Sequence, residues 1–291
     1  MRDVRLKKLV VAGVGLIGGS FALALKAAGR VERVVGVGRS SANLERALAA
    51  GVVDETAGSL ETALPGADLV LLAAPVGQNA RLIARLAAGL DGRTLVTDAG
   101  STKQDVVAIA RKLLGHHLPR FVPAHPIAGA EKSGAGAATA ALYRDRTVVL
   151  TPLPETDPQA RDTVRALWEA CGARVVEMAP ERHDRILAAV SHLPHLLAFA
   201  LMDLIAGEPE AETLLRFAGP GFRDVTRIAA SSPEMWRDVC LANRATLLEL
   251  IDAYRSRLDE VRGRLAQGDG EGLERLFTRA REARQRLDEE A

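Results

Sequence analysis

Three polar segments of this sequence contain side chains that can move protons and bind anions. They are residues 98–103 (DAGSTK), residues 125–134 (HPIAGAEKSG) and residues 191–195 (SHLPH), with Arg227 and Trp236 further along the chain. A histidine titrates near neutral pH and suits general acid–base chemistry, and a planar guanidinium can bind a carboxylate through two hydrogen bonds. The first two segments follow strand-like runs, and open α/β sheets bind ligands at the carboxyl ends of their strands. These segments are therefore the candidates for a catalytic site.

Each of these residues also has a structural interpretation when it is taken alone. A single histidine after a strand is more often a hydrogen-bonded loop residue, and Arg227 could be a surface arginine. Ser191, His192 and His195 could be satisfied polar groups around a proline kink. A zinc site built from His183, His192 and His195 is disfavoured, because the HExxH spacing and a thiolate cluster are both missing, and we expect no metal.

A glycine-rich turn near the N-terminus has the pattern of a dinucleotide site. It follows the strand-like run 8–12 and opens a helical stretch. In that context Gly13 allows the tight turn, Gly15 lets the backbone approach a pyrophosphate, and Gly18 lets the helix pack on the sheet. The free N–H groups of the helix start favour phosphate. The alternatives are a turn without a ligand, or a flavin or S-adenosylmethionine site. The residues expected to contact the pyrophosphate are Gly13, Gly15, Leu16, Ile17 and Gly18.

The residue that faces the adenosine ribose should follow the second strand. Arg39 stands there, 21 positions after Gly18, where an acidic residue would select NAD. A cation would attract a 2′-phosphate, and Ser40 or Ser41 could hydrogen-bond to it. The alternative is a solvated surface arginine. We therefore expect NADP to be preferred, or both NADP and NAD to be used.

Short β-branched runs alternate with helical stretches over the first 179 residues. This alternation predicts βαβ units and a doubly wound (Rossmann) parallel sheet. Ala74 and Pro75, at the end of one of these strands, are expected to contact the cofactor. The predicted strands are 8–12, 33–37, 69–74, 94–98, 121–124, 147–151 and 174–178, and the intervening helical stretches are 18–28, 43–50, 79–90, 103–114 and 159–171.

The pattern changes near residue 180, after which no strand signal remains. Residues 181–206 form one long helical stretch that is apolar nearly all round, which predicts burial, with a kink at Pro194. A glycine-proline loop at 219–221 follows, and Ser232 and Pro233 mark another helix start. We place a boundary between a dinucleotide-binding Rossmann domain (1–179) and an all-α substrate and dimerisation domain (180–291).

Apolar residues near the C-terminus recur with helix-pairing spacing. Those from Leu247 to Leu265 step by four and three, and Gly268 and Gly270 turn the chain into a last charged helix over 271–289. A stripe of this kind would otherwise face water, so we expect a homodimer through the C-terminal helices.

The composition excludes several classes of protein. The formal net charge is only +1, so no global field attracts nucleic acid or anionic lipid. Cys171 and Cys240 cannot make a disulfide framework, which favours a reducing compartment. The N-terminus lacks a secretory pattern, and the strongest apolar runs are broken by Gly, Pro or charge. We expect a cytoplasmic protein that binds neither nucleic acid nor membrane.

Taken together, the segments resemble the prephenate/arogenate (cyclohexadienyl) dehydrogenases of tyrosine biosynthesis. The likeness covers roughly residues 7–265. The HPIAG and SHLPH motifs are its specific parts, whereas the glycine-rich turn is shared with many dehydrogenases. The matching segments, in order, are 10–20, 97–103 (TDAGSTK), 124–134 (AHPIAGAEKSG), 190–195 (VSHLPH) and 221–236.

The resemblance implies an NAD(P)-dependent oxidative decarboxylation of a cyclohexadienol that carries a ring carboxylate. His125 matches the catalytic histidine, which takes or polarises the 4-hydroxyl proton, and Ser101 matches a serine that bonds the same hydroxyl. Arg227 matches the arginine that binds the substrate carboxylate. The further substrate-pocket positions are Ser191, His192, His195, Glu131 as an acidic gate or pocket residue, and Trp236 as a pocket wall near a dimer interface.

Other classes of protein remain as alternatives. The nearest is a Rossmann dehydrogenase of the β-hydroxyacid or imine-reductase type, which usually relies on a lysine in its helical domain. Residues 180–265 contain no lysine, which counts against it. A non-catalytic dinucleotide-binding module would need the glycine turn but not His125, Ser101 and Arg227 together. The choice between prephenate and arogenate stays open.

Overall fold

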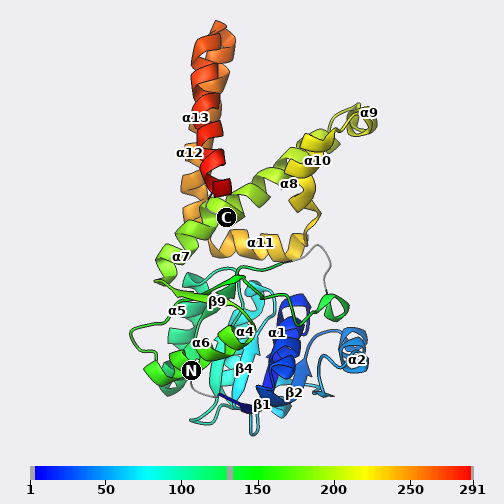
Figure 1. The fold of residues 1–291 in the computed structure, drawn as a ribbon, viewed down its shortest axis with the longest axis vertical. Coiled ribbons are helices and arrows are strands. Elements are labelled where there is room, and N and C mark those ends of the chain that lie inside the picture. Colours follow the sequence, from blue (N-terminus) through cyan, green and yellow to red (C-terminus); the bar gives the residue numbers. More distant parts are fainter. Residues whose placement is uncertain (1–3, 130–133, 290–291) are drawn as a thin grey trace. The chain divides into compact units, whose positions relative to one another are not determined.

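The computed structural model describes residues 4–129 and 134–289. Its larger sheet has six parallel strands in the order β3-β2-β1-β4-β5-β6, the doubly wound arrangement that the sequence predicts. Figure 1 shows helices α1, α4 and α6 beside these strands. The strands are β1 (Leu6–Ala12), β2 (Val31–Val37), β3 (Glu55–Thr56), β4 (Leu69–Leu72), β5 (Leu95–Asp98) and β6 (Phe121–Val122). The connecting helices are α1 (Leu16–Ala27), α2 (Ser41–Ala49), α3 (Leu60–Ala63), α4 (Asn79–Ala87) and α5 (Gln104–Leu113).

Alternate residues of the central strand enter two separate cores, because successive side chains of a strand point to opposite faces. Leu9 and Val11 belong to the core that holds α1 and α6 (Pro158–Ala170), where the rings of Phe21 and Trp168 lie 4.4 Å apart. Val10 belongs to the core under α3, α4 and α5. Both faces of the sheet are therefore covered, and its carboxyl edge remains for ligands.

A second, three-stranded sheet holds the strand that carries His125. The sequence predicts one strand over 121–124, but the chain leaves the parallel sheet at Pro123, which has no N–H to donate. Strand β7 (Ala124–Pro126) then pairs antiparallel with β8 (Thr147–Leu150), which pairs parallel with β9 (Arg174–Glu177). The change of sheet places His125 beside the end of β5.

The helical part begins at α7 (Pro180–Leu187), passes through a π-helical turn (Ala188–His192) and continues as α8 (Leu193–Ala206). Pro194 cannot donate to the carbonyl four residues earlier, and the π turn lies just before it, where the sequence predicts a kink. The glycine-proline segment predicted as a loop starts helix α10. Further helices are α9 (Ala211–Arg216), α10 (Pro220–Thr226) and α11 (Pro233–Ala242).

The prediction that residues 181–206 are buried is wrong for the single chain. Val190 is 70% exposed and Leu204 is 62% exposed, and Ala198 is the buried residue of α8. Among the described residues, Pro180–Ala206 is also the one helical stretch that is long and apolar enough to cross a membrane, judged by length and composition alone. An apolar helix of a soluble protein can pass the same test, so it is weak evidence for a membrane.

The chain divides into two compact units, residues 1–244 and residues 245–291. The second unit contains most of α12 (Arg244–Gln267) and all of α13 (Gly270–Glu289). Gly268 turns the chain between them with a φ of +65°. Arg264 fastens this turn through hydrogen bonds to Asp269 at 2.7 Å and Glu260 at 3.0 Å.

Candidate active site

The glycine-rich turn has the geometry that its sequence requires. Gly13 has a φ of +106°, and a Cβ there would lie 2.5 Å from the carbonyl oxygen of Ala73. A Cβ on Gly18 would meet the carbonyl of Gly13 and would lie 2.7 Å from a methyl group of Val11. A Cβ on Gly15, in contrast, would meet nothing within 4 Å. The space beside Gly15 is therefore open for a ligand to approach the backbone.

The start of helix α1 is built for an anion. Gly15 is its N-cap, no side chain caps it, and its first turn holds no acidic residue. The carbonyl of Ile17 accepts a hydrogen bond from the hydroxyl of Tyr143 at 2.6 Å, which ties residues 134–143 to this helix. Ala74 lies against the turn, with its backbone nitrogen 2.7 Å from the Cβ position of Gly13. Pro75 follows as the N-cap of the 3-10 turn Val76–Gln78. These residues fit a dinucleotide pyrophosphate.

Arg39 lies exposed after the end of β2 and forms an ion pair within the chain. Its guanidinium is 3.3 Å from the carboxylate of Glu234, in the first turn of α11. The Ser40 hydroxyl caps helix α2 by accepting the N–H of Asn43 at 3.3 Å. The first turn of α2 has no acidic residue. Sequence reasoning had no means of finding Glu234, which lies 195 positions from Arg39.

A buried ion pair fixes the start of the strand that carries His125. Lys103 and Asp98 are paired with no exposed surface, at the end of β5. The ammonium of Lys103 also donates to the carbonyl of Ala124 at 2.6 Å, and Asp98 accepts the N–H of Ala124 at 3.1 Å. The N–H and the carbonyl of Ala124 are thus both hydrogen-bonded by side chains at the end of β5, close in sequence to Ser101. Lys103 and Asp98 belong to the predicted motif, but the motif did not reveal this function.

His125 is the end of a hydrogen-bonded row of three side chains. Its Nδ1 lies 2.8 Å from Nε2 of His183, whose Nδ1 lies 2.8 Å from Oδ1 of Asp184. Burial lowers the pKa of His125 well below its usual value, and positive charge on His183, Lys103 and His192 lowers it further. His125 is therefore neutral at neutral pH and can accept a proton. From the sequence, His183 is considered only as a disfavoured zinc ligand, and Asp184 is not singled out at all.

His192, in the π turn, is buried with one donor unused. Asn243 donates through Nδ2 to the carbonyl of Asp184 at 2.8 Å and lies 3.3 Å from Nδ1 of His192. Burial is the main reason that the pKa of His192 is lowered to about 4, and the negative charge of Asp184 opposes part of this lowering. With Nδ1 accepting, the hydrogen lies on Nε2, which has no hydrogen-bond partner among the described residues. Asn243 thus joins His192 to the carbonyl of Asp184, next to the His125 row.

His195, Trp236 and Arg227 form the other part of the site. The rings of His195 and Trp236 stack with centroids 3.7 Å apart, and His195 donates through Nδ1 to the carbonyl of Ser191 at 2.8 Å. Burial lowers the pKa of His195, and the positive charge of nearby Arg227 adds to this. The Trp236 Nε1–H also lacks a partner among the described residues. Glu131 lies outside the described residues.

Trp236 also joins the site to the cofactor loop. It packs with Val239 of α11 against Val76, and a Cβ on Gly77 would collide with the carboxylate of Asp238. Helix α11 therefore lies directly on the loop that follows β4, next to the glycine-rich turn. The candidate substrate and cofactor positions are adjacent.

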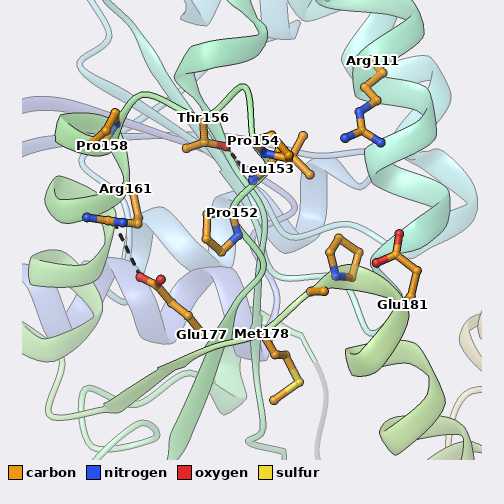
Figure 2. Close-up of a pocket in the computed structure, with 12 residues that line it drawn as sticks. Arg111, Pro152, Leu153, Pro154, Thr156, Pro158, Arg161, Glu177, Met178 and Glu181 are labelled. Carbon is orange, nitrogen blue, oxygen red and sulfur yellow. Dashed lines mark hydrogen bonds and ion pairs between the residues drawn. The ribbon is translucent and has the colours of Figure 1, made fainter.

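A separate cavity of about 620 Å³ contains none of the predicted site residues (Figure 2). Proline side chains and Leu153 form much of its wall, and Arg161 and Glu177 pair across it at 3.7 Å. Its lining includes no histidine, cysteine or serine. We assign no chemistry to it.

Comparison with known proteins gives a consistent result over nearly the whole chain. The sequence profile of the prephenate dehydrogenase nucleotide-binding domain matches residues 21–177, and that of the prephenate dehydrogenase dimerization domain matches residues 179–279. The prephenate dehydrogenase of Bacillus subtilis is 40% identical over 96% of this chain and 76% of its own length. The cyclohexadienyl dehydrogenase of Zymomonas mobilis is 36% identical over 96% of this chain and 95% of its own.

A solved structure shows the same similarity in three dimensions. The prephenate dehydrogenase of Aquifex aeolicus, in complex with hydroxyphenyl propionate and NAD+, superposes with a TM-score of 0.90 at 34% identity. The superposition covers 98% of this chain and all of that one.

Proposed function

Because this chain belongs to the prephenate dehydrogenase family and catalyses an NAD(P)-dependent oxidative decarboxylation in tyrosine biosynthesis, we propose how its own residues carry out that reaction. The substrate is prephenate, arogenate or both. Gly13, Gly15 and Gly18, with Ala74 and Pro75 beside them, would hold the dinucleotide, which supplies the hydride acceptor when bound. The chain must supply a base at the substrate hydroxyl and cations at its carboxylates.

His125 is the base. It accepts the proton of the 4-hydroxyl as the hydride leaves the same carbon, so that the carbon–oxygen bond becomes a carbonyl. The electron pair of the breaking bond to CO2 then flows through the ring to that oxygen, which takes the proton back as a phenol. The proton that His125 removes thus returns to the same oxygen. The gain of aromaticity drives the reaction, so the enzyme mainly positions and polarises its substrate. Ser101 hydrogen-bonds to the same hydroxyl.

The carboxylates of the substrate meet the second group of residues. Arg227 binds one carboxylate, and His195, whose ring is held by Trp236 and Ser191, lies beside it. The unpaired Nε2–H of buried His192 supports this placement, because a buried donor without a partner is costly unless a ligand supplies the acceptor. Glu131 acts as an acidic gate or pocket residue.

For the cofactor we propose a preference for NADP, with NAD also used. Arg39 would pair with the 2′-phosphate, with support from the Ser40 hydroxyl at the start of α2. The Arg39–Glu234 ion pair must open for this contact to form. Glu234 therefore competes with the phosphate.

We further propose a cytoplasmic homodimer that assembles through the C-terminal helical region. Val190 and Leu204 on the helix Pro180–Ala206 are exposed, as are Leu258 and Leu265 of α12 in the predicted seam. Large apolar side chains that are this exposed on two helical segments favour a partner surface. We keep the division into a dinucleotide-binding domain (1–179) and a helical substrate and dimerisation domain (180–291).

The observation that carries this assignment is the neutral, partly buried His125 at the cofactor edge of the sheet with the His192 donor near it. The test is the absorbance of reduced nicotinamide formed with prephenate or arogenate, each with NAD and NADP. We expect turnover with at least one substrate and a higher kcat/KM with NADP. No absorbance rise in any of the four combinations would refute the assignment.

A further inference from the structure

Two adjacent buried side chains, His183 and Asp184, and the partly buried His125, 58 positions from His183, form one hydrogen-bonded row that ends on the proposed base. We propose that Asp184 and His183 are positioning residues that hold His125 in the tautomer whose Nε2 accepts the substrate proton. The proposal rests on the role given to His125 above. It adds two residues that no motif pointed to.

The row starts at Asp184, a residue of α7 whose carboxylate lies at the N-terminus of α5. Its Oδ1 accepts the backbone N–H of Lys103 at 2.8 Å, and its Oδ2 accepts that of Gln104 at 2.9 Å. Burial alone would raise the pKa of Asp184, but hydrogen bonds from His183 and from these two backbone groups lower it. The positive end of the helix dipole acts in the same direction. An ionised carboxylate has acceptor atoms only, so Asp184 cannot donate to His183.

This fixes where the hydrogens of both imidazoles lie. Since Asp184 accepts, His183 carries a hydrogen on Nδ1, and in the proposed row its Nε2 is the acceptor. The contact of 2.8 Å between that Nε2 and Nδ1 of His125 then requires the hydrogen on Nδ1 of His125. The Nε2 of His125 keeps its lone pair. That nitrogen is the base.

Burial makes this arrangement stringent. His183 is 0% exposed and Asp184 is 1% exposed, so water cannot replace either partner. When His125 takes a proton, its new charge lies in line with the carboxylate of Asp184 through His183, as an aspartate supports the histidine of a serine-protease triad. The positive charge of Lys103 opposes the imidazolium, and Asp184 supplies the counter-charge.

Two substitutions of His183 separate positioning from structure. His183→Leu fills a similar volume but removes the acceptor, whereas the carbonyl of His183→Gln can still accept from Nδ1 of His125. We expect His183→Leu to lower kcat by about 10- to 100-fold with KM for the substrate within about twofold. His183→Gln should recover most of that loss. His117→Leu, which removes another buried histidine away from the row, should keep wild-type kcat.

A spectroscopic readout independent of turnover completes the test. The ¹⁵N shifts of the ring nitrogens, measured on histidine-labelled enzyme, report which nitrogen carries the hydrogen. We expect His125 to show Nδ1–H in the wild type and in His183→Gln, and a mixture of tautomers in His183→Leu. Thermal unfolding and cofactor affinity, measured on each variant, show whether a variant has lost its fold instead.

The outcomes distinguish this proposal from the function on which it rests. If His125→Asn abolishes turnover while His183→Leu keeps both kcat and the Nδ1–H signal, the positioning role is wrong and the base stands. If His125→Asn keeps turnover, the proposed base itself is wrong. If the wild type shows Nε2–H on His125, the direction of the row is reversed and the proposal falls.

Discussion

His125 lies among groups that all favour its neutral form, and this sets the pH range in which it can act. Burial, followed by the charges of His183, Lys103 and His192, lowers its pKa well below 6.5. A histidine with a lowered pKa stays deprotonated as the pH falls through the usual range. We expect the acidic limb of kcat against pH to lie below pH 6.5, measured at saturating substrate. A limb at or above pH 6.5 would contradict this.

The contribution of the same imidazole can be measured by removing it. His125→Asn keeps a polar side chain but no titrating nitrogen, so we expect kcat to fall by about 10²- to 10⁴-fold with a smaller change in KM. His116→Asn, which removes an exposed histidine, is the matched control and should behave as the wild type. Near-normal kcat for His125→Asn would show that another group is the base.

At the residue scale, motif and spacing predict identities but not contacts. His125, Ser101 and His192 are found from the sequence because each belongs to a segment with recognisable types. The partner of His125 is not, because His183 lies 58 positions away and meets it only through the packing of α7 against β7 and α5. Periodicity carries no information about such a meeting. The same holds for Glu234 opposite Arg39.

The elements of the parallel sheet follow from the sequence because each strand is an unbroken apolar run between helices. The separation of β6 from β7 at Pro123 does not follow from the sequence. The two strands form one apolar run, and only the missing N–H of Pro123 marks the change of sheet. Helix α10 is missed for a related reason. Gly219 and Pro220 are typical of a loop, but Pro220 stands at the first helical position, where its fixed φ favours the helix.

The contact between the end of β2 and the start of α11 predicts a change in cofactor choice. Glu234 neutralises Arg39 at 3.3 Å, so Glu234→Gln should leave the guanidinium free for a 2′-phosphate. Because both groups are about half exposed, the effect is modest, and we expect the NADP/NAD ratio of kcat/KM to rise by about two- to fivefold. Arg39→Asp should lower the same ratio.

Steady-state kinetics with both cofactors measures this ratio. Glu212→Gln, on exposed α9, removes one carboxylate without touching Arg39 and serves as the control for net charge. An unchanged ratio in both Glu234→Gln and Arg39→Asp would show that Arg39 does not meet the ribose.

For the whole molecule, the exposed apolar side chains predict a second copy. Val190, Leu204 and Phe217 are 62–81% exposed in the single chain. We expect light scattering at micromolar concentration to give twice the mass of one chain, and Val190→Asp with Leu204→Asp to shift it towards the monomer. Leu48→Asp, an exposed leucine on α2, should leave the mass unchanged. A monomeric wild type would refute the dimer.

This scale also explains why one prediction from sequence was wrong. The apolar pattern of residues 181–206 predicts that the helix is covered, and burial within its own chain was inferred from it, but Val190 and Leu204 are exposed. A sequence does not say whether the covering surface comes from the same chain or from another one. The apolar pattern is therefore the same for a core helix and for an interface helix.

The carboxylate of Asp184 couples the contact between two helices to the state of the catalytic imidazole. It holds the first backbone N–H groups of α5 from a different helix, α7, while it supports His125 through His183. Any opening that separates α7 from α5 must release these amides and free the imidazole to change tautomer in the same event. We therefore expect that any such opening would remove catalytic activity, and that hydrogen exchange at Lys103 and Gln104 would measure how often it occurs.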